Sequence, residues 1–150
     1  MVDFPQVVAH FIDGKMLKGT TQDFNPTRPS FHIKPAGGGP AVEVRCALLK
    51  AVFFVKSLEG NSKRQDLRGF LTAPAATNHG KKLALRFKDG ELMCGYTLSH
   101  RTDREGFFLF PADSEGNNIR VYVLLAQVAV TMAGAAAEAL VREHMESLDS

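Results

Sequence analysis

Apolar and polar residues alternate in short runs along most of the chain, and turn residues separate the runs. Residues 8–12 and 83–87 each lead into an Asp-Gly pair and a second apolar run, the pattern of a hairpin with a two-residue turn. Aromatic runs, FHIKP and FFLFP, follow in each half and end in a proline, which closes a strand or marks a sheet edge. The runs VEVRCALLKAVFFVKS and IRVYVLLAQVAVTM are long enough for one bent strand or two joined strands. Each half therefore predicts about five strands.

The two halves match each other at an offset of 76 residues, without a gap. Twelve identical pairs fall within the 49 positions from 8 to 56: Phe11/Phe87, Asp13/Asp89, Gly14/Gly90, Gly19/Gly95, Thr21/Thr97, Arg28/Arg104, Phe31/Phe107, Pro35/Pro111, Ala36/Ala112, Leu48/Leu124, Leu49/Leu125 and Val52/Val128. An ungapped match that includes a turn dipeptide, two glycines and a proline predicts an internal duplication.

This pattern predicts a mostly β fold made of two tandem small β-barrels of SH3-like or Sm-like type, because closing a sheet hides its edges. The alternative is one β-sandwich or one fused barrel. The expected boundaries are 1–56 for the first barrel, 57–80 for a linker rich in Gly, Asn, Pro and Ala, and 81–131 for the second barrel. Residues 132–150 are expected to form a C-terminal helix and tail.

The C-terminal helix is predicted from its periodicity. Thr131 is placed to cap it, and Glu138 and Arg142 are spaced for an i,i+4 ion pair. Six residues lie near one stripe of the expected helix, which we predict to be its packed face: Met132, Ala136, Leu140, Val141, His144 and Leu148.

Composition and charge exclude several classes of protein. An apolar content of 45% and a charged content of 23% in 150 residues are typical of a folded chain rather than a disordered one. The net charge of +2 is too small to indicate nucleic-acid binding. We find no signal peptide and no apolar stretch near the roughly 20 residues of a membrane helix, so we expect a cytoplasmic protein. Cys46 and Cys94 are expected to be small buried apolar residues.

The residues that most often carry chemistry have structural explanations here. Asp13 and Asp89 each precede a turn glycine, where Asp bonds the local backbone. The run 37–39 lacks the Lys-Ser/Thr that a phosphate-binding loop needs, and the five histidines are too scattered for a metal site. No nucleophile motif occurs. We therefore predict a protein that is not an enzyme and that uses no cofactor and no metal.

Two groups of basic residues are candidates for ligand binding. Arg28 and Arg104 occupy equivalent positions before the aromatic runs, where a guanidinium is able to bind a carboxylate or phosphate, although an internal salt bridge is the commoner role. Lys63, Arg64 and Arg68 form a compact cluster in the linker that is able to meet an anion, although a solvated linker face is the commoner explanation.

The pattern FxDGxxxxG, the aromatic run ending in Pro-Ala and the segment LLKAVFFVKSLEGN resemble an uncharacterised bacterial domain family of tandem small β-barrels. Its members stand alone or accompany PilZ and other signalling domains, so the resemblance implies a role in signalling. The spacing of Arg64 and Arg68 also resembles the first half of the cyclic-di-GMP motif of PilZ domains, but the second half, Asp/Asn-x-Ser-x-x-Gly, is missing.

These observations lead to one functional hypothesis with two alternatives. The first is a non-enzymatic protein-interaction or scaffolding module in bacterial signalling, with an unidentified protein partner. The alternatives are a sensor of a small anion such as cyclic-di-GMP, and an RNA-binding protein of Sm-like type. The oligomeric state does not follow from the sequence.

Overall fold

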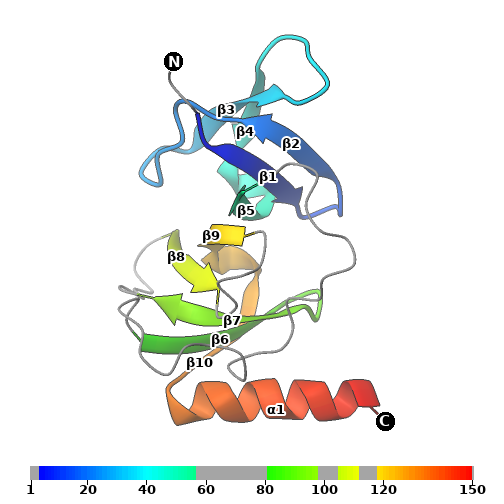
Figure 1. Cartoon of the computed structure of the whole chain (residues 1–150), viewed down its shortest axis with the longest axis vertical. Coiled ribbons are helices and arrows are strands. Elements are labelled where there is room, and N and C mark those ends of the chain that lie inside the picture. Colours follow the sequence, from blue (N-terminus) through cyan, green and yellow to red (C-terminus); the bar gives the residue numbers. More distant parts are fainter. Residues whose placement is uncertain (1–3, 57–80, 98–104, 112–117, 150) are drawn as a thin grey trace.

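The computed structural model describes residues 4–56, 81–97, 105–111 and 118–149 of the chain. Its elements follow the two halves of the sequence (Figure 1). The first half holds β1 (Gln6–Phe11), β2 (Met16–Thr20), β3 (Ser30–Pro35), β4 (Val42–Arg45), the 3₁₀-helix η1 (Cys46–Leu48) and β5 (Leu49–Val55). The second half holds β6 (Lys81–Phe87), β7 (Leu92–Thr97), β8 (Gly106–Pro111), β9 (Asn118–Leu124), the 3₁₀-helix η3 (Leu125–Gln127), β10 (Val128–Ala133) and the helix α1 (Ala135–Asp149).

All ten described strands belong to one antiparallel sheet in the order β10-β6-β7-β8-β9-β5-β1-β2-β3-β4. The mostly β fold with a C-terminal helix is as predicted. The two separate closed barrels are not seen: β5 of the first half pairs with β9 of the second, and the sheet remains open at β4 and β10. The sequence pattern did not reveal this joint, because the local pattern of a strand does not identify a distant strand as its partner.

The strands of the two halves pair in the same order, but not in the ungapped register that the sequence suggested. Phe31 pairs with Val44, and Phe107 pairs with Val123. The offset is thus 76 between the two phenylalanines and 79 between the two valines. The connections 36–41 and 112–117 are equally long, so the change comes from three additional residues at the start of β9, before Val121. The matches of Leu48, Leu49 and Val52 with Leu124, Leu125 and Val128 are therefore out of register in the structure.

The interior consists of two apolar cores that share strands. The first core contains Val7, Ala9, Phe31, Ile33, Val44, Cys46, Leu49, Val52, Phe54, Tyr122 and Leu124. The second core contains Val8, Ala51, Phe53, Val55, Leu83, Leu85, Phe87, Phe107, Leu109, Val121 and Val123. Successive residues of β1, β5 and β9 thus point alternately into one core and the other, as the period of two in a strand requires.

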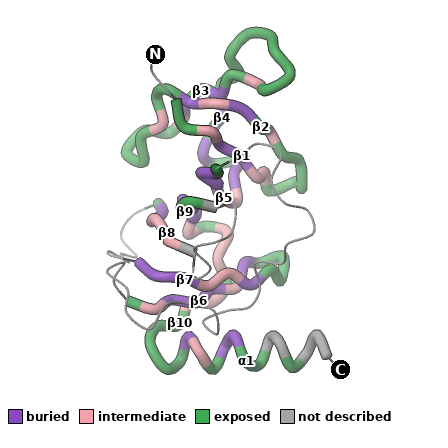
Figure 2. Tube along the Cα trace, viewed as in Figure 1, coloured by how far each residue is buried: buried purple, intermediate pink, exposed green. Residues whose placement is uncertain are grey.

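Burial on both faces explains the composition of these central strands. A strand with one solvated face alternates apolar and polar residues, whereas a strand covered on both faces is continuously apolar. In β5, the segment Ala51–Val55 has no exposed residue, and Figure 2 shows buried residues along the middle of the molecule.

The helix α1 covers the outward face of the second half. Ala137, Leu140 and Val141 of the helix pack on Ala84 and Leu92, and the Lys82 ammonium bonds the Glu138 carboxylate at 2.7 Å. In the figure the helix runs beneath β6 and β10 (Figure 1).

The start of α1 differs from the prediction. Thr131 does not cap the helix, because it lies in β10 and pairs with Leu85. The chain turns at Gly134, whose φ of +61° favours glycine, and the carbonyl of Gly134 accepts bonds from the amides of Ala137 and Glu138. The buried stripe is correspondingly shifted from Ala136, which is exposed, to Ala137. No helix in the described part of the chain has the length and apolar character of a membrane span.

Candidate functional site

The structure describes one of the five basic residues predicted to bind a ligand. Arg28 is exposed, and within the described residues its guanidinium makes no ion pair, so the expected salt bridge is absent there. Its main-chain carbonyl accepts a bond from the Cys46 thiol at 3.8 Å. Lys63, Arg64, Arg68 and Arg104 lie outside the described residues.

The two Asp-Gly turns have matching hydrogen bonds. The Phe11 amide bonds the Lys15 carbonyl and the Gly14 amide bonds the Phe11 carbonyl, and Phe87, Glu91 and Gly90 repeat both bonds in the second half. Gly14 and Gly90 have φ values of +92° and +95°. The loops have three residues rather than the predicted two, the type that places glycine in the left-handed region.

Both turn aspartates bond the backbone as predicted. Asp13 Oδ1 accepts from the Lys15 amide at 2.9 Å, and Asp89 Oδ1 accepts from the Glu91 amide at 3.0 Å. Asp89 has a second role, because its other oxygen lies 2.8 Å from the Lys50 ammonium. The second-half turn is thus anchored to β5 of the first half.

Lys50 is the centre of this joint between the halves. Its ammonium contacts the carboxylates of both Asp89 and Glu91, and it lies 4.5 Å from the centroid of the Phe87 ring. Burial disfavours the charged ammonium, but the two carboxylate hydrogen bonds outweigh that effect and raise the pKa of Lys50. The hydrogen bond from Lys50 lowers the pKa of Asp89. Two negative charges thus share one positive charge within this joint.

A pocket of about 490 Å³ lies beside this joint. His10, Ile12, Lys15, Lys50, Asp89 and Glu91 are among the residues that line it. The His10 ring packs on Phe53, with centroids 4.3 Å apart. Burial lowers the pKa of His10, and Lys50 and Lys18 act in the same direction, whereas Glu91 opposes them. His10 therefore contributes a neutral imidazole to the pocket near neutral pH.

Two exposed apolar residues lie at this site, one in the lining of the pocket and one bonded to it through the main chain. Ile12, which is 51% exposed, lines the pocket, and its amide bonds the carbonyl of Leu48, which is 55% exposed. We call these two residues the Ile12–Leu48 patch. The same main-chain bond in the second half joins Lys88 to Gln127. The backbone of this position accepts polar side chains, so folding does not explain why the first half has apolar ones.

A cluster of aromatic rings closes the first core near the joint of β5 and β9. Phe24 lies 5.3 Å from the ring centroids of both Phe54 and Tyr122. The guanidinium carbon of Arg120 lies 4.5 Å from the centroids of both Phe54 and Phe108, so the cation lies against both rings. This arrangement fixes the loop that carries Phe24 against the central strands.

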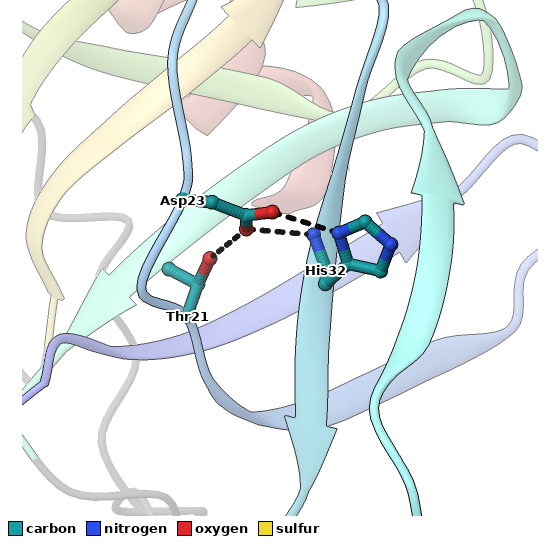
Figure 3. A network of polar contacts seen from close by, with 3 residues as sticks. All are labelled: Thr21, Asp23 and His32. Carbon is teal, nitrogen blue, oxygen red and sulfur yellow. Dashed lines mark hydrogen bonds and ion pairs between the residues drawn. The ribbon is translucent and has the colours of Figure 1, made fainter.

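Thr21, Asp23 and His32 form a polar network that superficially resembles a catalytic constellation (Figure 3). Asp23 accepts bonds from the main-chain amide and Nδ1 of His32, at 2.8 and 2.7 Å. Partial burial opposes ionisation, but the bonds from His32 prevail and lower the pKa of Asp23. The Thr21 hydroxyl also bonds Asp23, at 3.4 Å, and not the imidazole. The network lacks a nucleophile next to its base, so we interpret it as a brace between the loop and β3.

The two cysteines are free thiols, and burial raises the pKa of Cys46 and raises that of Cys94 to about 11. Cys46 belongs to the first core, as predicted, and Cys94 is half-buried beside α1. The described residues hold no group of three His, Cys, Asp or Glu side chains that is able to bind a metal ion.

Sequence reasoning missed His10, Lys50, Glu91 and the Ile12–Leu48 patch. One signal was available, since Lys50 is the single charge within LLKAVFFV, where both faces of the strand are buried. The patch was hidden by the ungapped register, which matched Leu48 with Leu124 instead of its polar counterpart Gln127.

Comparison with known proteins gives one match. Residues 4–133 match the model of a family of unknown function (DUF6982). No curated protein and no solved structure matches the chain. The match agrees with the predicted uncharacterised family, and the comparisons show no connection with PilZ domains.

Proposed function

The chain belongs to this family of unknown function, and from its structure we propose that it is a non-enzymatic protein-interaction module, in bacterial signalling as the resemblance implies. The observation that carries the proposal is the Ile12–Leu48 patch. Two apolar residues that are joined by a main-chain hydrogen bond, each more than half exposed, occupy positions where the second half has Lys88 and Gln127. Exposed apolar groups that packing does not require are typical of binding surfaces.

The chemistry of the pocket defines the partner. The pocket lining carries two carboxylates, Asp89 and Glu91, and two ammonium groups, Lys15 and Lys50, so its formal charges balance, and the Ile12–Leu48 patch offers apolar contact beside them. We therefore expect the partner to present an apolar side chain next to a polar group that is able to hydrogen-bond these charged groups. The apolar contact supplies most of the affinity, and the hydrogen bonds orient the partner.

The test replaces the patch with the residues that the second half has at the same positions. The Ile12→Lys, Leu48→Gln double variant should fold normally, because Lys88 and Gln127 are accommodated by the same backbone. We expect it to lose at least about tenfold in partner affinity, as hot-spot residues do. Partners are captured from a lysate of the encoding organism, identified by mass spectrometry, and then measured as purified proteins by titration calorimetry.

The matched control is the Lys88→Ala, Gln127→Ala variant, which changes the corresponding positions of the second half and should bind as the wild type does. A partner held equally by the wild type and the Ile12→Lys, Leu48→Gln variant would contradict the proposal. So would the absence of any partner that purified wild-type protein binds.

The two halves also support the proposal of an internal duplication. They share the order of their strands, the pairing of β3 with β4 and of β8 with β9, and the hydrogen bonds of their turns. We infer that both derive from one unit, and that the units differ by three residues at the start of β9.

A further inference from the structure

Strand β4 is the end of the described sheet on the side of the first half. It pairs with β3, and no described strand pairs with its other edge. Val42 is 42% exposed, and Glu43 and Arg45 are also exposed. An edge of this kind presents main-chain N–H and C=O groups that a further strand is able to bond.

The second half contains a direct precedent for such a strand. Its counterpart of β4 is β9, since Val121 and Val123 pair with β8 as Val42 and Val44 pair with β3. The other edge of β9 is occupied by β5, antiparallel, over Ala51–Val55. The same edge is therefore filled in one half of the molecule and unfilled, among the described residues, in the other.

We propose that the outer edge of β4 binds an extended segment of a partner protein by strand addition, in the antiparallel arrangement that β5 adopts along β9. In that joint Val123 faces Ala51, Tyr122 faces Val52 and Val121 faces Phe53. On β4 the corresponding residues are Val44, Glu43 and Val42. The segment that fits has a small residue opposite Val44, a basic residue opposite Glu43 and an aromatic residue opposite Val42.

The side chains of β4 explain why a single strand, rather than another copy of the sheet, is the occupant. Tyr122 and Leu124 of β9 point into the first core, whereas the corresponding residues of β4 are Glu43 and Arg45. Both of these residues are exposed, and Arg45 Nε lies 3.8 Å from Glu43 Oε1. Charges at these positions oppose the stacking of an apolar sheet face. They leave the main chain of the edge accessible.

The probe is a synthetic peptide derived from β5. It has the sequence Leu-Lys-Ala-Lys-Phe-Phe-Val, in which lysine replaces the residue corresponding to Val52, with polar flanking residues for solubility. A second peptide has glutamate at that position. We expect the lysine peptide to bind and to slow amide hydrogen exchange at residues 42–45. The glutamate peptide should bind at least about fivefold more weakly, because like charges then face each other.

Three variants of the full chain separate this surface from the rest of the molecule. Val42→Lys should weaken the lysine peptide about fivefold, because it removes the contact with the aromatic residue and adds a like charge. Met16→Lys, at a similarly exposed position of β2, should leave binding unchanged. The Ile12→Lys, Leu48→Gln variant should also bind normally, so failure here is distinguishable from failure of the proposed function.

Circular dichroism of each variant verifies the fold before binding is measured. Equal binding of the two peptides, protection at residues other than 42–45, or binding of neither peptide to folded wild-type protein would each overturn the proposal. A lysine peptide in which alternate amides are N-methylated gives a further check. Only one of the two possible alternate patterns should abolish binding, because a strand bonds its neighbour through every second residue.

Discussion

His10 illustrates how a single side chain depends on both halves of the molecule. Its strand belongs to the first half, its ring lies on Phe53, and Glu91 of the second half is the charge that favours its protonation. Burial prevails over Glu91 and lowers the pKa of His10 in the folded protein. The unfolded chain therefore binds a proton at this residue more readily than the folded chain does.

This difference predicts that the protein loses stability as the pH falls below about 6.5, the ordinary pKa of histidine. The slope from one such group is at most about 1.4 kcal/mol per pH unit. We expect His10→Phe, which keeps a ring against Phe53, to flatten the dependence between pH 7 and pH 5. Urea unfolding at several pH values measures it. Parallel curves for the variant and the wild type would refute this explanation.

At the scale of the elements, a close approach of two strands determines which residue is tolerated. Strands β2 and β3 pair over only two residues, Gly19 with Pro35 and Thr20 with Lys34. A Cβ atom at Gly19 would lie 2.1 Å from the carbonyl oxygen of Lys34, which belongs to the backbone and has little freedom to move. Glycine is therefore required here by space and not by its own φ.

We expect Gly19→Ala to lower the free energy of unfolding by about 2 to 4 kcal/mol, because the two strands must separate to admit the methyl group. Gly37→Ala is the matched control, since a Cβ atom there meets nothing within 4 Å, and it should change stability by less than about 1 kcal/mol. Denaturant titration of both variants provides the comparison. Equal stabilities would show that β2 and β3 adjust at no cost.

Most strands follow from sequence alone, whereas the joint between the halves does not. The runs FHIKP and FFLFP correspond to β3 and β8, and VEVRCALLKAVFFVKS divides at η1 into β4 and β5. The pairing of β5 with β9 depends on contacts between distant parts of the chain. The continuous apolar character of AVFFV was nevertheless a physical signal, because a closed barrel leaves one face of each strand in water.

The candidate site was less predictable than the fold for a related reason. Ile12, Lys50 and Glu91 come from three separate segments and meet only because β5 joins the second half. The predicted roles of Asp13 and Asp89 were confirmed, since those depend on bonds within two residues. The basic cluster Lys63, Arg64 and Arg68 remains a prediction.

The whole molecule is a stack in which each layer covers the one before it (Figure 1). The outward face of the first half, with Val8 and Phe53, is covered by the second half, and the corresponding face of the second half, with Ala84 and Val130, is covered by α1. The helix thus occupies the place that a third unit would take. It ends the stack in the manner of a capping element in a repeat protein.

Weakening the helix contact should expose this apolar face. We expect the Leu140→Ala, Val141→Ala variant to lose about 3 kcal/mol of stability and to self-associate. The Ala139→Ser, Glu143→Gln variant alters exposed positions of the same helix and should change stability by less than about 0.5 kcal/mol. Unfolding curves and light scattering measure both effects. A monodisperse double alanine variant of unchanged stability would show that α1 does not act as a cap.

Strands β5 and β9 contribute residues to both cores, so the two halves depend on each other for their packing. The first core includes Tyr122 and Leu124 from the second half, and the second core includes Val8 and Phe53 from the first. Neither half therefore contains a complete core, and disrupting one core removes residues that pack in the other. Despite the two similar halves of its sequence, we therefore expect the protein to fold and unfold as one cooperative unit.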